Sequence, residues 1–329
     1  MARIVRFHEY GDPNVLRIED VELPALEHDE VRISIRSIGL NRAESMFRRN
    51  AYVQQAVFPS RLGYEASGVV ESVGSSVSEF RKGDVVSVIP TSDMSRWSTY
   101  GEIAHLPAKM VVKHPENLSF EEAAASWMQY VTAWGALVDQ AKLKSGEFVI
   151  VTAASSSVGL AAFQVARMAG ATVIATTRTS AKRQALLDAG AHHVVATEEE
   201  DLVARVMELT GRKGARVVFD PIGGPMFDAL TKCMSRGGIL LEYGALSSEP
   251  TPFPQFTVLG KSLTLKGYLY NEIIEDDAAL SRAKAFITDG LASGKLKPII
   301  AKVFPFDQIQ DATRYLESNE QVGKVIVNV

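Results

Sequence analysis

The chain has 329 residues, a net charge of −4 and a single cysteine, Cys233. This length favours two domains, because single hydrophobic cores stop growing below ~300 residues. The charge gives no overall attraction to nucleic acid or anionic membranes, and one cysteine excludes an intrachain disulfide or a cluster of cysteine ligands. No apolar run approaches the ~20 residues that span a bilayer. We therefore expect a soluble, cytoplasmic protein with no nucleic-acid or membrane partner.

The first 122 residues have the pattern of a β-rich domain. Segments 31–38, 68–74 and 85–89 are strand-like, because polar and apolar residues alternate or glycines flank a β-branched run. Short strands with glycine-bearing turns predict a small barrel or a bent sheet. Ser119 and Glu122 then have the spacing of a capping box, which predicts that a helix begins there.

From residue 123 onwards, strands and helices alternate, which predicts a parallel sheet covered by helices on both faces. The expected strands are 147–152, 172–176, 193–195, 216–220 and 238–243, and the expected helices are 158–169, 181–189, 199–210 and 225–234. We assign this second domain to residues 123–267. The last segment, 268–329, is expected to return and complete the first domain, with helices near 277–290 and 307–317 and a strand at 324–329.

A strand, a turn of small residues and a helix follow residue 147 and organise the second domain. The start of such a helix has unpaired N–H groups and the positive end of the helix dipole, so it can bind a phosphate. The usual dinucleotide-binding turn has three glycines. Only the third is present here, in the run Ala154, Ser155, Ser156, Ser157, Val158 and Gly159. A serine-rich helix cap explains this turn as well as a dinucleotide site does.

The end of the next strand distinguishes two dinucleotides. An NAD site usually has an acidic residue there, which binds the ribose 2′-hydroxyl. Thr177 holds that position, Arg178 follows, and Lys182 lies about one helical turn further. A guanidinium and an ammonium group suit a 2′-phosphate. Solvated basic residues would give the same pattern, but helix starts normally favour acids, so we predict NADP(H) rather than NAD(H).

The order of these motifs resembles that of the medium-chain dehydrogenase/reductase superfamily, and within it the zinc-free quinone oxidoreductase-like enzymes. The segments that carry the resemblance are 39–44, 62–70, 83–86, 121–124, 132–134, 157–159, 217–224 and 323–325. The resemblance implies an α/β protein with a GroES-like, β-rich catalytic domain and a Rossmann domain, whose doubly wound parallel sheet binds the cofactor. It also implies a homodimer formed through the edge of the Rossmann sheet, near residues 262–268.

Zinc-dependent members of this superfamily bind catalytic zinc through two cysteines and a histidine. The matching positions here are Asn41, Tyr64 and Met128, whereas zinc prefers thiolate, imidazole or carboxylate ligands. We therefore expect no metal. Without a Lewis acid, hydride transfer needs an acceptor that is already electrophilic, such as a quinone or an α,β-unsaturated carbonyl (an enone or enal).

The resemblance also suggests roles for individual residues. Asn41, Tyr52 and Tyr64 are expected to donate hydrogen bonds to the acceptor oxygen, although each could instead only pack or hold a turn. Further cofactor contacts are expected from Thr132, Tyr243, Gly244 and Lys324, with Gln129 lining the same cleft. Glu65 is expected to be a buried structural residue.

Two other functions stay open at this stage. One is an alcohol or carbonyl dehydrogenase, which would have to polarise a carbonyl without metal. The other is a protein that binds NADPH without turnover, as a sensor or a structural protein. The substrate itself is not predicted, because loops near 45–60, 90–100 and 245–275 form the pocket walls and the shape of these loops does not follow from the sequence.

Overall fold

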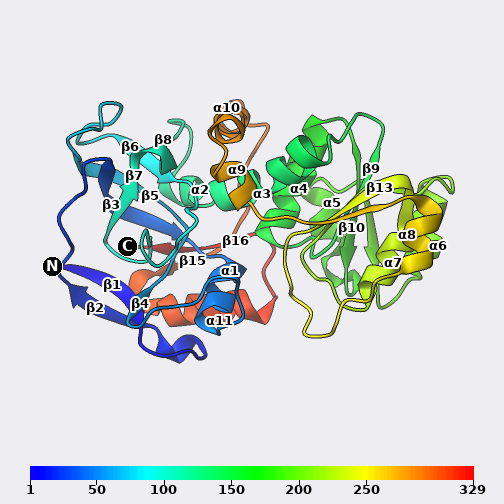
Figure 1. Cartoon of the computed structure of the whole chain (residues 1–329), viewed down its shortest axis with the longest axis horizontal. Coiled ribbons are helices and arrows are strands. Elements are labelled where there is room, and N and C mark those ends of the chain that lie inside the picture. Colours follow the sequence, from blue (N-terminus) through cyan, green and yellow to red (C-terminus); the bar gives the residue numbers. More distant parts are fainter. The chain divides into compact units, whose positions relative to one another are not determined.

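A computed structural model describes all 329 residues, Met1–Val329 (Figure 1). The chain forms two compact units: unit 1 contains Met1–Met128 and Thr288–Val329, and unit 2 contains Gln129–Ile287. Unit 1 is therefore discontinuous. The boundaries lie later than the sequence-based ones at 122/123 and 267/268, and the second is displaced furthest.

Packing explains where the second boundary lies. The Tyr268 side chain approaches the Val131 carbonyl oxygen, with Oη at 3.5 Å, and a Cβ on Gly135 would come within 2.5 Å of Ile273. Tyr268 and helix α9 (Asn271–Ile274) thus pack with α3 (Trp127–Trp134) and the π-helix Gly135–Gln140, and Arg282 of α10 (Asp277–Ala292) donates to Asp139 Oδ1 of that π-helix at 3.0 Å. These contacts assign residues up to Ile287 to unit 2.

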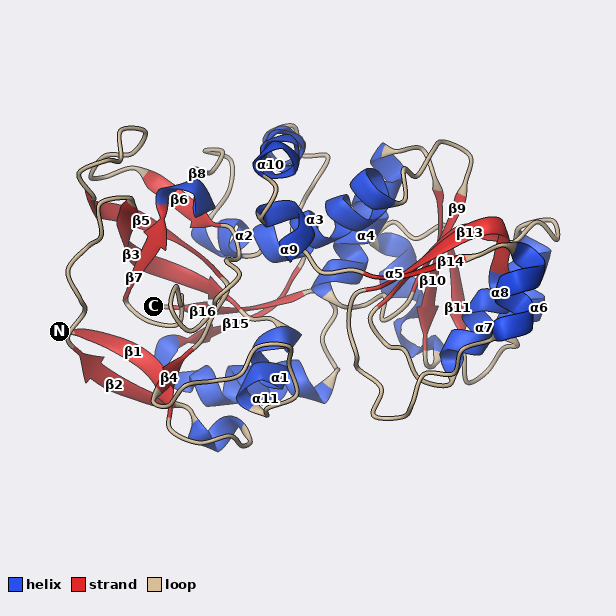
Figure 2. Cartoon of the chain, viewed as in Figure 1, coloured by secondary structure: helices blue, strands red, loops and turns tan.

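Unit 1 is built around two sheets (Figure 2). The larger one has the strand order β15-β16-β3-β5-β6-β8, with β7 paired to β3, and the smaller one has the order β2-β1-β4. All neighbours are antiparallel except β15 and β16. The bounds are β1 (Ala2–Phe7), β2 (Arg17–Val21), β3 (Glu30–Gly39), β4 (Ser60–Arg61), β5 (Glu65–Val73), β6 (Val85–Val88), β7 (Ile103–Pro107), β8 (Val111–Lys113), β15 (Ile300–Pro305) and β16 (Lys324–Asn328).

Three helices belong to unit 1: α1 (Arg42–Arg48), α2 (Phe120–Ala124) and α11 (Ile309–Ser318). The capping box is present, because Ser119 Oγ accepts from Glu122 N at 3.2 Å and Glu122 Oε2 accepts from Ser119 N at 3.0 Å. The helix that it starts is short, and α3 begins separately at Trp127. No helix of either unit combines the length and apolar composition that a membrane span requires.

Unit 2 contains a six-stranded, fully parallel sheet in the order β11-β10-β9-β12-β13-β14. Numbered along the chain from β9, this order is 3-2-1-4-5-6, which is that of the Rossmann fold. The strands are β9 (Phe148–Val151), β10 (Thr172–Thr177), β11 (His193–Ala196), β12 (Ala215–Asp220), β13 (Met234–Glu242) and β14 (Thr264–Gly267). The helices between them are α4 (Ser157–Met168), α5 (Arg183–Asp188), α6 (Leu202–Leu209), α7 (Met226–Cys233) and α8 (Gln255–Lys261).

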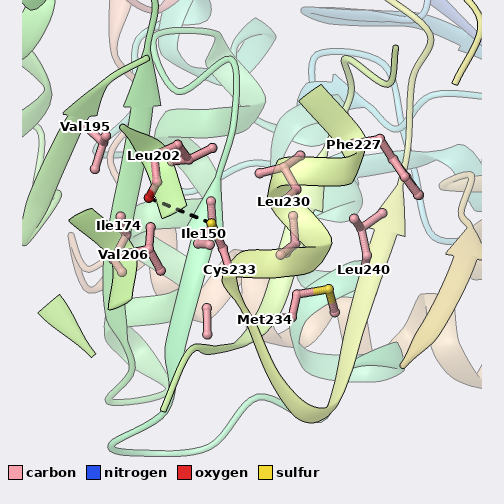
Figure 3. Packing of buried hydrophobic residues seen from close by; sticks show 12 residues of the cluster. Ile150, Ile174, Val195, Leu202, Val206, Phe227, Leu230, Cys233, Met234 and Leu240 are labelled. Atoms are coloured by element: carbon pink, nitrogen blue, oxygen red, sulfur yellow. Dashed lines mark hydrogen bonds between the residues drawn. The ribbon is translucent and has the colours of Figure 1, made fainter. Parts of the chain in front are cut away.

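Helices lie on both sides of this sheet, with α4 on one side and α6, α7 and α8 on the other (Figure 2). The core on the second side includes Ile150, Ile174, Leu230 and Leu240 (Figure 3). Cys233 is buried in it, and burial raises the pKa of its thiol to about 12. The only cysteine is therefore an unreactive core residue.

Candidate functional site

The turn after β9 brings a helix N-terminus very close to the preceding backbone. Ser156 caps α4, and its Oγ accepts a hydrogen bond from Gly159 N at 3.1 Å. A Cβ on Gly159 would lie 2.7 Å from the Ala154 carbonyl oxygen, so a glycine is needed there. The turn is thus both a serine cap and a close glycine approach of the dinucleotide-binding kind.

The end of β10 lies beside this turn. Ala154 N donates to the Thr176 carbonyl oxygen at 3.4 Å, and Lys182 Nζ lies 3.2 Å from Ser155 Oγ. Arg178 follows the strand directly, with an exposed side chain. The structure therefore brings Lys182 to the turn, with Arg178 at the same edge of the sheet.

An acidic residue also reaches this region, and the sequence reasoning did not identify it. Glu199, from the connection after β11, accepts hydrogen bonds through Oε1 from Ser180 N at 2.9 Å and from Ser180 Oγ at 3.2 Å. The acidic run 198–201 after an expected strand was a usable signal, because parallel neighbouring strands end at the same edge of a sheet.

Tyr243 and Gly244 follow β13 at this same edge. The Tyr243 ring stacks on Phe219, with centroids 4.0 Å apart. Burial raises the pKa of the Tyr243 phenol, which lies beside Ser156. A Cβ on Gly244 would come within 2.8 Å of the Pro221 carbonyl oxygen. Tyr243 therefore lies beside the turn at residues 154–159 and Gly244 packs against Pro221, whereas Thr132 and Gln129 are buried in helix α3.

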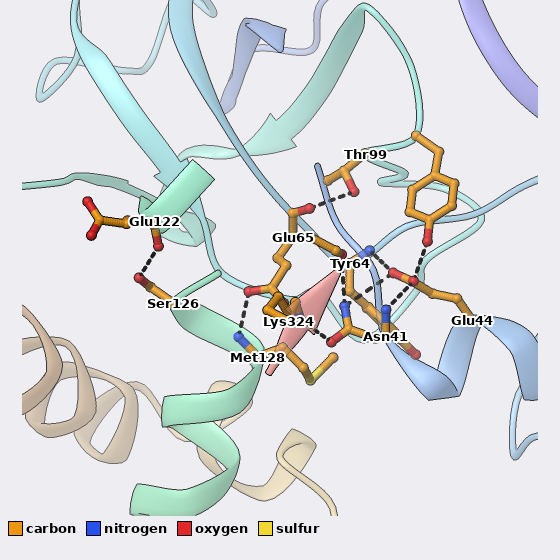
Figure 4. A network of polar contacts seen from close by, with 11 residues as sticks. Asn41, Glu44, Tyr64, Glu65, Thr99, Glu122, Ser126, Met128 and Lys324 are labelled. Carbon is orange, nitrogen blue, oxygen red and sulfur yellow. Dashed lines mark hydrogen bonds and ion pairs between the residues drawn. The ribbon is translucent and has the colours of Figure 1, made fainter. Parts of the chain in front are cut away.

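Figure 4 shows a buried polar network within unit 1. Asn41 caps α1, and its Nδ2 donates to the Gly39 carbonyl oxygen at 3.1 Å and to Glu44 Oε1 at 3.3 Å. Its Oδ1 accepts from Lys324 Nζ at 2.6 Å. Both amide hydrogens of Asn41 thus have acceptors inside unit 1, and its role as a donor to an acceptor oxygen stays a prediction.

Lys324 is placed differently from the expectation. It begins β16, is 1% exposed, and forms an ion pair with Glu65, whose other carboxylate oxygen accepts from Met128 N at 3.0 Å. Glu65 is fully buried, as expected. The Lys324 ammonium is thus neither solvated nor placed to bind a 2′-phosphate, because two buried partners in unit 1 already hold it.

Glu44 connects this network to the tyrosines. Its carboxylate accepts hydrogen bonds from Asn41 N at 2.7 Å, Tyr64 N at 2.9 Å and Tyr100 Oη at 2.5 Å. Burial raises the pKa of Glu44 to about 7. Tyr64 Oη in turn donates to Tyr52 Oη at 3.2 Å, and burial raises the pKa of the Tyr52 phenol. Tyr52 therefore stays protonated at neutral pH, with its own proton directed away from Tyr64.

Two family models match the chain: one for the GroES-like domain of alcohol dehydrogenases, over residues 27–116, and one described as zinc-binding dehydrogenase, over residues 157–285. Human quinone oxidoreductase is 30% identical over 329 residues, covering 99% of this chain and 98% of the relative. Quinone oxidoreductase 1 of Escherichia coli is 32% identical over 335 residues, covering 99% of both chains. The chain belongs to the quinone oxidoreductase-like branch of the medium-chain dehydrogenase/reductase superfamily.

Solved structures of the superfamily confirm the α/β fold with GroES-like and Rossmann domains. Escherichia coli quinone oxidoreductase complexed with NADPH has a TM-score of 0.90 and 30% identity, with both chains covered completely. An NAD-dependent alcohol dehydrogenase gives the same TM-score of 0.90 and the same 30% identity. Fold similarity alone therefore does not choose between the two cofactors or between the two substrate classes.

One of the family models is named for zinc, but the donors at the corresponding positions of this quinone oxidoreductase-like chain do not fit that metal. The Asn41 carbonyl oxygen faces the Lys324 ammonium, a cation, at 2.6 Å, while Tyr64 and Met128 supply a phenol and a thioether. No cluster of three or more His, Cys, Asp or Glu side chains could hold a metal elsewhere.

Proposed function

We propose that the protein is a zinc-independent, NADP(H)-dependent oxidoreductase that transfers hydride to a quinone or to an α,β-unsaturated carbonyl. One observation carries the choice of cofactor: the end of β10 holds Arg178 and no acid of its own, with Lys182 Nζ 3.2 Å from Ser155 Oγ on the turn after β9. The quinone oxidoreductase relatives, one of them complexed with NADPH, support the reaction type.

The turn at residues 154–159, here called the phosphate turn, offers the groups that a dinucleotide would need. The first N–H groups of α4 and the hydroxyls of Ser155 and Ser157 would bind the pyrophosphate, and Gly159 allows the close approach. Arg178 and Lys182 would bind the 2′-phosphate through charge-assisted hydrogen bonds. Thr177, Thr132, Ala154, Val158, Tyr243 and Gly244 complete the proposed cofactor residues. A bound nicotinamide would supply the hydride.

On the acceptor side we propose Tyr52 as the hydrogen-bond donor. Hydride addition to a quinone or enone leaves negative charge on the carbonyl oxygen, and a neutral phenol stabilises that charge. Tyr64 donates to Tyr52 at 3.2 Å, which polarises the Tyr52 hydroxyl further. Asn41 and Glu44 act as positioning residues, because Glu44 Oε1 accepts both Asn41 Nδ2 and Tyr64 N.

Replacement of Tyr52 by phenylalanine should lower kcat by roughly 10²-fold, the effect of losing one oxyanion donor. The Kd for NADPH should stay unchanged, because Tyr52 is not one of the proposed cofactor residues. Steady-state kinetics and fluorescence titration measure the two quantities. Tyr315→Phe, a phenol on α11 packed against Phe304, is the control. A Tyr52→Phe enzyme with wild-type kcat would remove Tyr52 from the site.

NADPH oxidation measured against a panel of quinones, enals and enones, with and without a chelator, tests the whole proposal. We expect turnover of at least one acceptor that the chelator does not change. Oxidation of alcohols with NADP⁺ and no reduction of the panel, or turnover only with added zinc, would favour the alcohol dehydrogenase alternative that one structural relative suggests. Tight NADPH binding with no turnover would favour a non-catalytic binding protein.

We also propose a homodimer formed through the edge of the unit 2 sheet. Strand β14 ends the sheet and pairs only with β13, so its outer side is open. Near it, Phe253, Phe256 and Leu259 are 68%, 85% and 67% exposed. An open strand edge beside exposed large apolar side chains is typical of an interface.

Charged substitutions should break this dimer. Light scattering of the wild type is expected to give twice the mass of the chain, and the double variant Phe256→Glu/Leu259→Glu is expected to give the mass of the monomer. Glu249→Gln, an exposed substitution in the preceding loop, serves as the control. A monomeric wild type at micromolar concentration would rule the dimer out.

A further inference from the structure

Two carboxyl groups from neighbouring strands meet at the edge of the sheet where the phosphate turn lies. Asp220 ends β12, Glu242 ends β13, and the parallel register pairs these two residues. Paired residues of parallel strands point to the same face of a sheet. The two carboxyl groups are accordingly in hydrogen-bonding contact.

The two carboxyl groups differ in their other partners. Asp220 accepts from the Thr152 hydroxyl, from Ile222 N at 3.2 Å and from Gly223 N at 3.0 Å. Both carboxyl oxygens of Glu242 are buried, and no N–H or hydroxyl group donates to them. Asp220 is therefore suited to carry a negative charge, whereas Glu242 is suited to be the protonated partner that donates to it.

No basic side chain compensates the pair. The groups that shift the pKa of Glu242 are its own burial and Asp220, and the pKa rises to about 9. Burial also raises the pKa of Asp220, and Tyr243 is the other titratable group that faces the two carboxyls. Two carboxylates in contact without a cation cannot both ionise easily, so the pair holds one proton at neutral pH.

The pair connects three segments at the carboxyl end of the sheet. Thr152 follows β9 and leads directly into the phosphate turn. The Asp220 carbonyl oxygen accepts from Tyr243 N at 2.9 Å, and Ser247 N donates to Ile222 O at 2.9 Å. Hydrogen bonds to Asp220 and to Ile222 therefore hold the segments after β9, β12 and β13 together.

We propose that Asp220 and Glu242 are positioning residues that share one proton, and that this proton keeps the phosphate turn in its binding geometry. The inference rests on the proposed function, since the ligand of the turn is taken to be NADPH. Loss of the proton places two negative charges in contact beneath the turn. The repulsion strains the Thr152–Asp220 link, and the added charge disfavours a phosphate ligand.

The variant Glu242→Gln tests the shared proton, because its amide donates to Asp220 at every pH. The first measurement is thermal unfolding of the cofactor-free protein between pH 5 and about 10. A glutamate whose pKa is raised in the folded state contributes its full stabilisation of the fold only at pH values below the pKa that it has in the unfolded chain. Wild-type Tm should therefore fall relative to Glu242→Gln from about pH 5 to about 9, after which the difference stays constant. Glu249→Gln, an exposed acid nearby, should follow the wild type.

The second measurement is the Kd for NADPH over the same pH range. Wild-type affinity should fall about tenfold one pH unit above the pKa of Glu242, because only the protonated pair supports binding. Glu242→Gln should lack this alkaline loss. Coinciding stability profiles of the wild type and Glu242→Gln would overturn the shared proton. A difference in stability without any difference in the pH dependence of Kd would overturn the positioning role.

Two further outcomes are decisive. Absence of NADPH binding at every pH would refute the proposed function and the positioning role with it, while the unfolding measurement still decides whether the pair holds a proton. If Glu242→Gln does not fold, the infrared spectrum of the wild type decides that point. A protonated-carboxyl band should persist above the range in which Glu44, with a pKa of about 7, ionises. If this band disappears over the pH range in which Glu44 ionises, the proposal of a shared proton is overturned.

Discussion

Replacement of Lys324 by methionine should destabilise the protein by about 3–5 kcal/mol, because it removes one partner of a buried ion pair. Both side chains of the pair are essentially inaccessible, at 0% for Lys324 and 1% for Glu65. The variant leaves the Glu65 carboxylate without its cation and Asn41 Oδ1 without its donor. Equilibrium unfolding in urea, followed through a probe in unit 1, measures the loss.

Two further variants distinguish the effect of leaving a buried charge unpaired from the effect of removing any lysine. Lys324→Met/Glu65→Gln should recover part of the stability, because no unpaired charge then remains buried. Lys295→Met changes an exposed lysine of the same unit and should alter stability by no more than about 0.5 kcal/mol. Equal effects of Lys324→Met and Lys295→Met would show that the ion pair is not needed.

Replacement of Arg178 by alanine should weaken NADPH binding roughly tenfold to hundredfold and leave NADH binding nearly unchanged. Only NADPH carries the 2′-phosphate, and a hydrogen bond to a charged group contributes about 1.5–3 kcal/mol. Fluorescence titration with the two cofactors gives both Kd values. Their ratio is informative even if the variant is somewhat less stable.

The control for Arg178 is Lys213→Ala. Lys213 is an exposed base of the same unit, but it lies just before β12, at the amino-terminal edge of the sheet. Lys213→Ala removes one positive charge, as Arg178→Ala does, but at the opposite edge of the sheet from the turn. NADPH binding by this variant should therefore change little. If Arg178→Ala leaves the Kd values of both cofactors unchanged, Arg178 is a solvated surface charge. Glu199, the acid that accepts a hydrogen bond from Ser180, would then be the candidate ligand of the ribose.

The secondary structure was largely predictable because its signals are local. The alternation after residue 123 located every strand of unit 2 through β13 to within a few residues, and the 119–122 spacing identified a real capping box. The short α2 and the separate start of α3 were not predicted, since nothing in the alanine-rich run distinguishes one helix from two. The unit boundary at Ile287 depends on which helices pack together, which is tertiary information.

The same contrast between local signals and tertiary information applies to the candidate functional residues. The proposed phosphate turn and the basic end of β10 are continuous in sequence, so both could be proposed from the pattern of residues alone. Lys324 was misplaced because its partners Asn41 and Glu65 lie more than 250 positions away. Glu242 was not considered, since its contact with Asp220 exists only through the register of β12 and β13.

The discontinuity of unit 1 also bears on how the chain is made. Unit 2 is one continuous segment, Gln129–Ile287, and all of it is translated before Lys324. Until then the Glu65 carboxylate has no cation inside unit 1, and β3 lacks its neighbour β16. Domains usually fold from the N-terminus onwards during synthesis, but here the middle of the chain can mature first. A nascent chain stopped before β16 would keep an open sheet and an unpaired buried charge, and these are features that chaperones and proteases recognise.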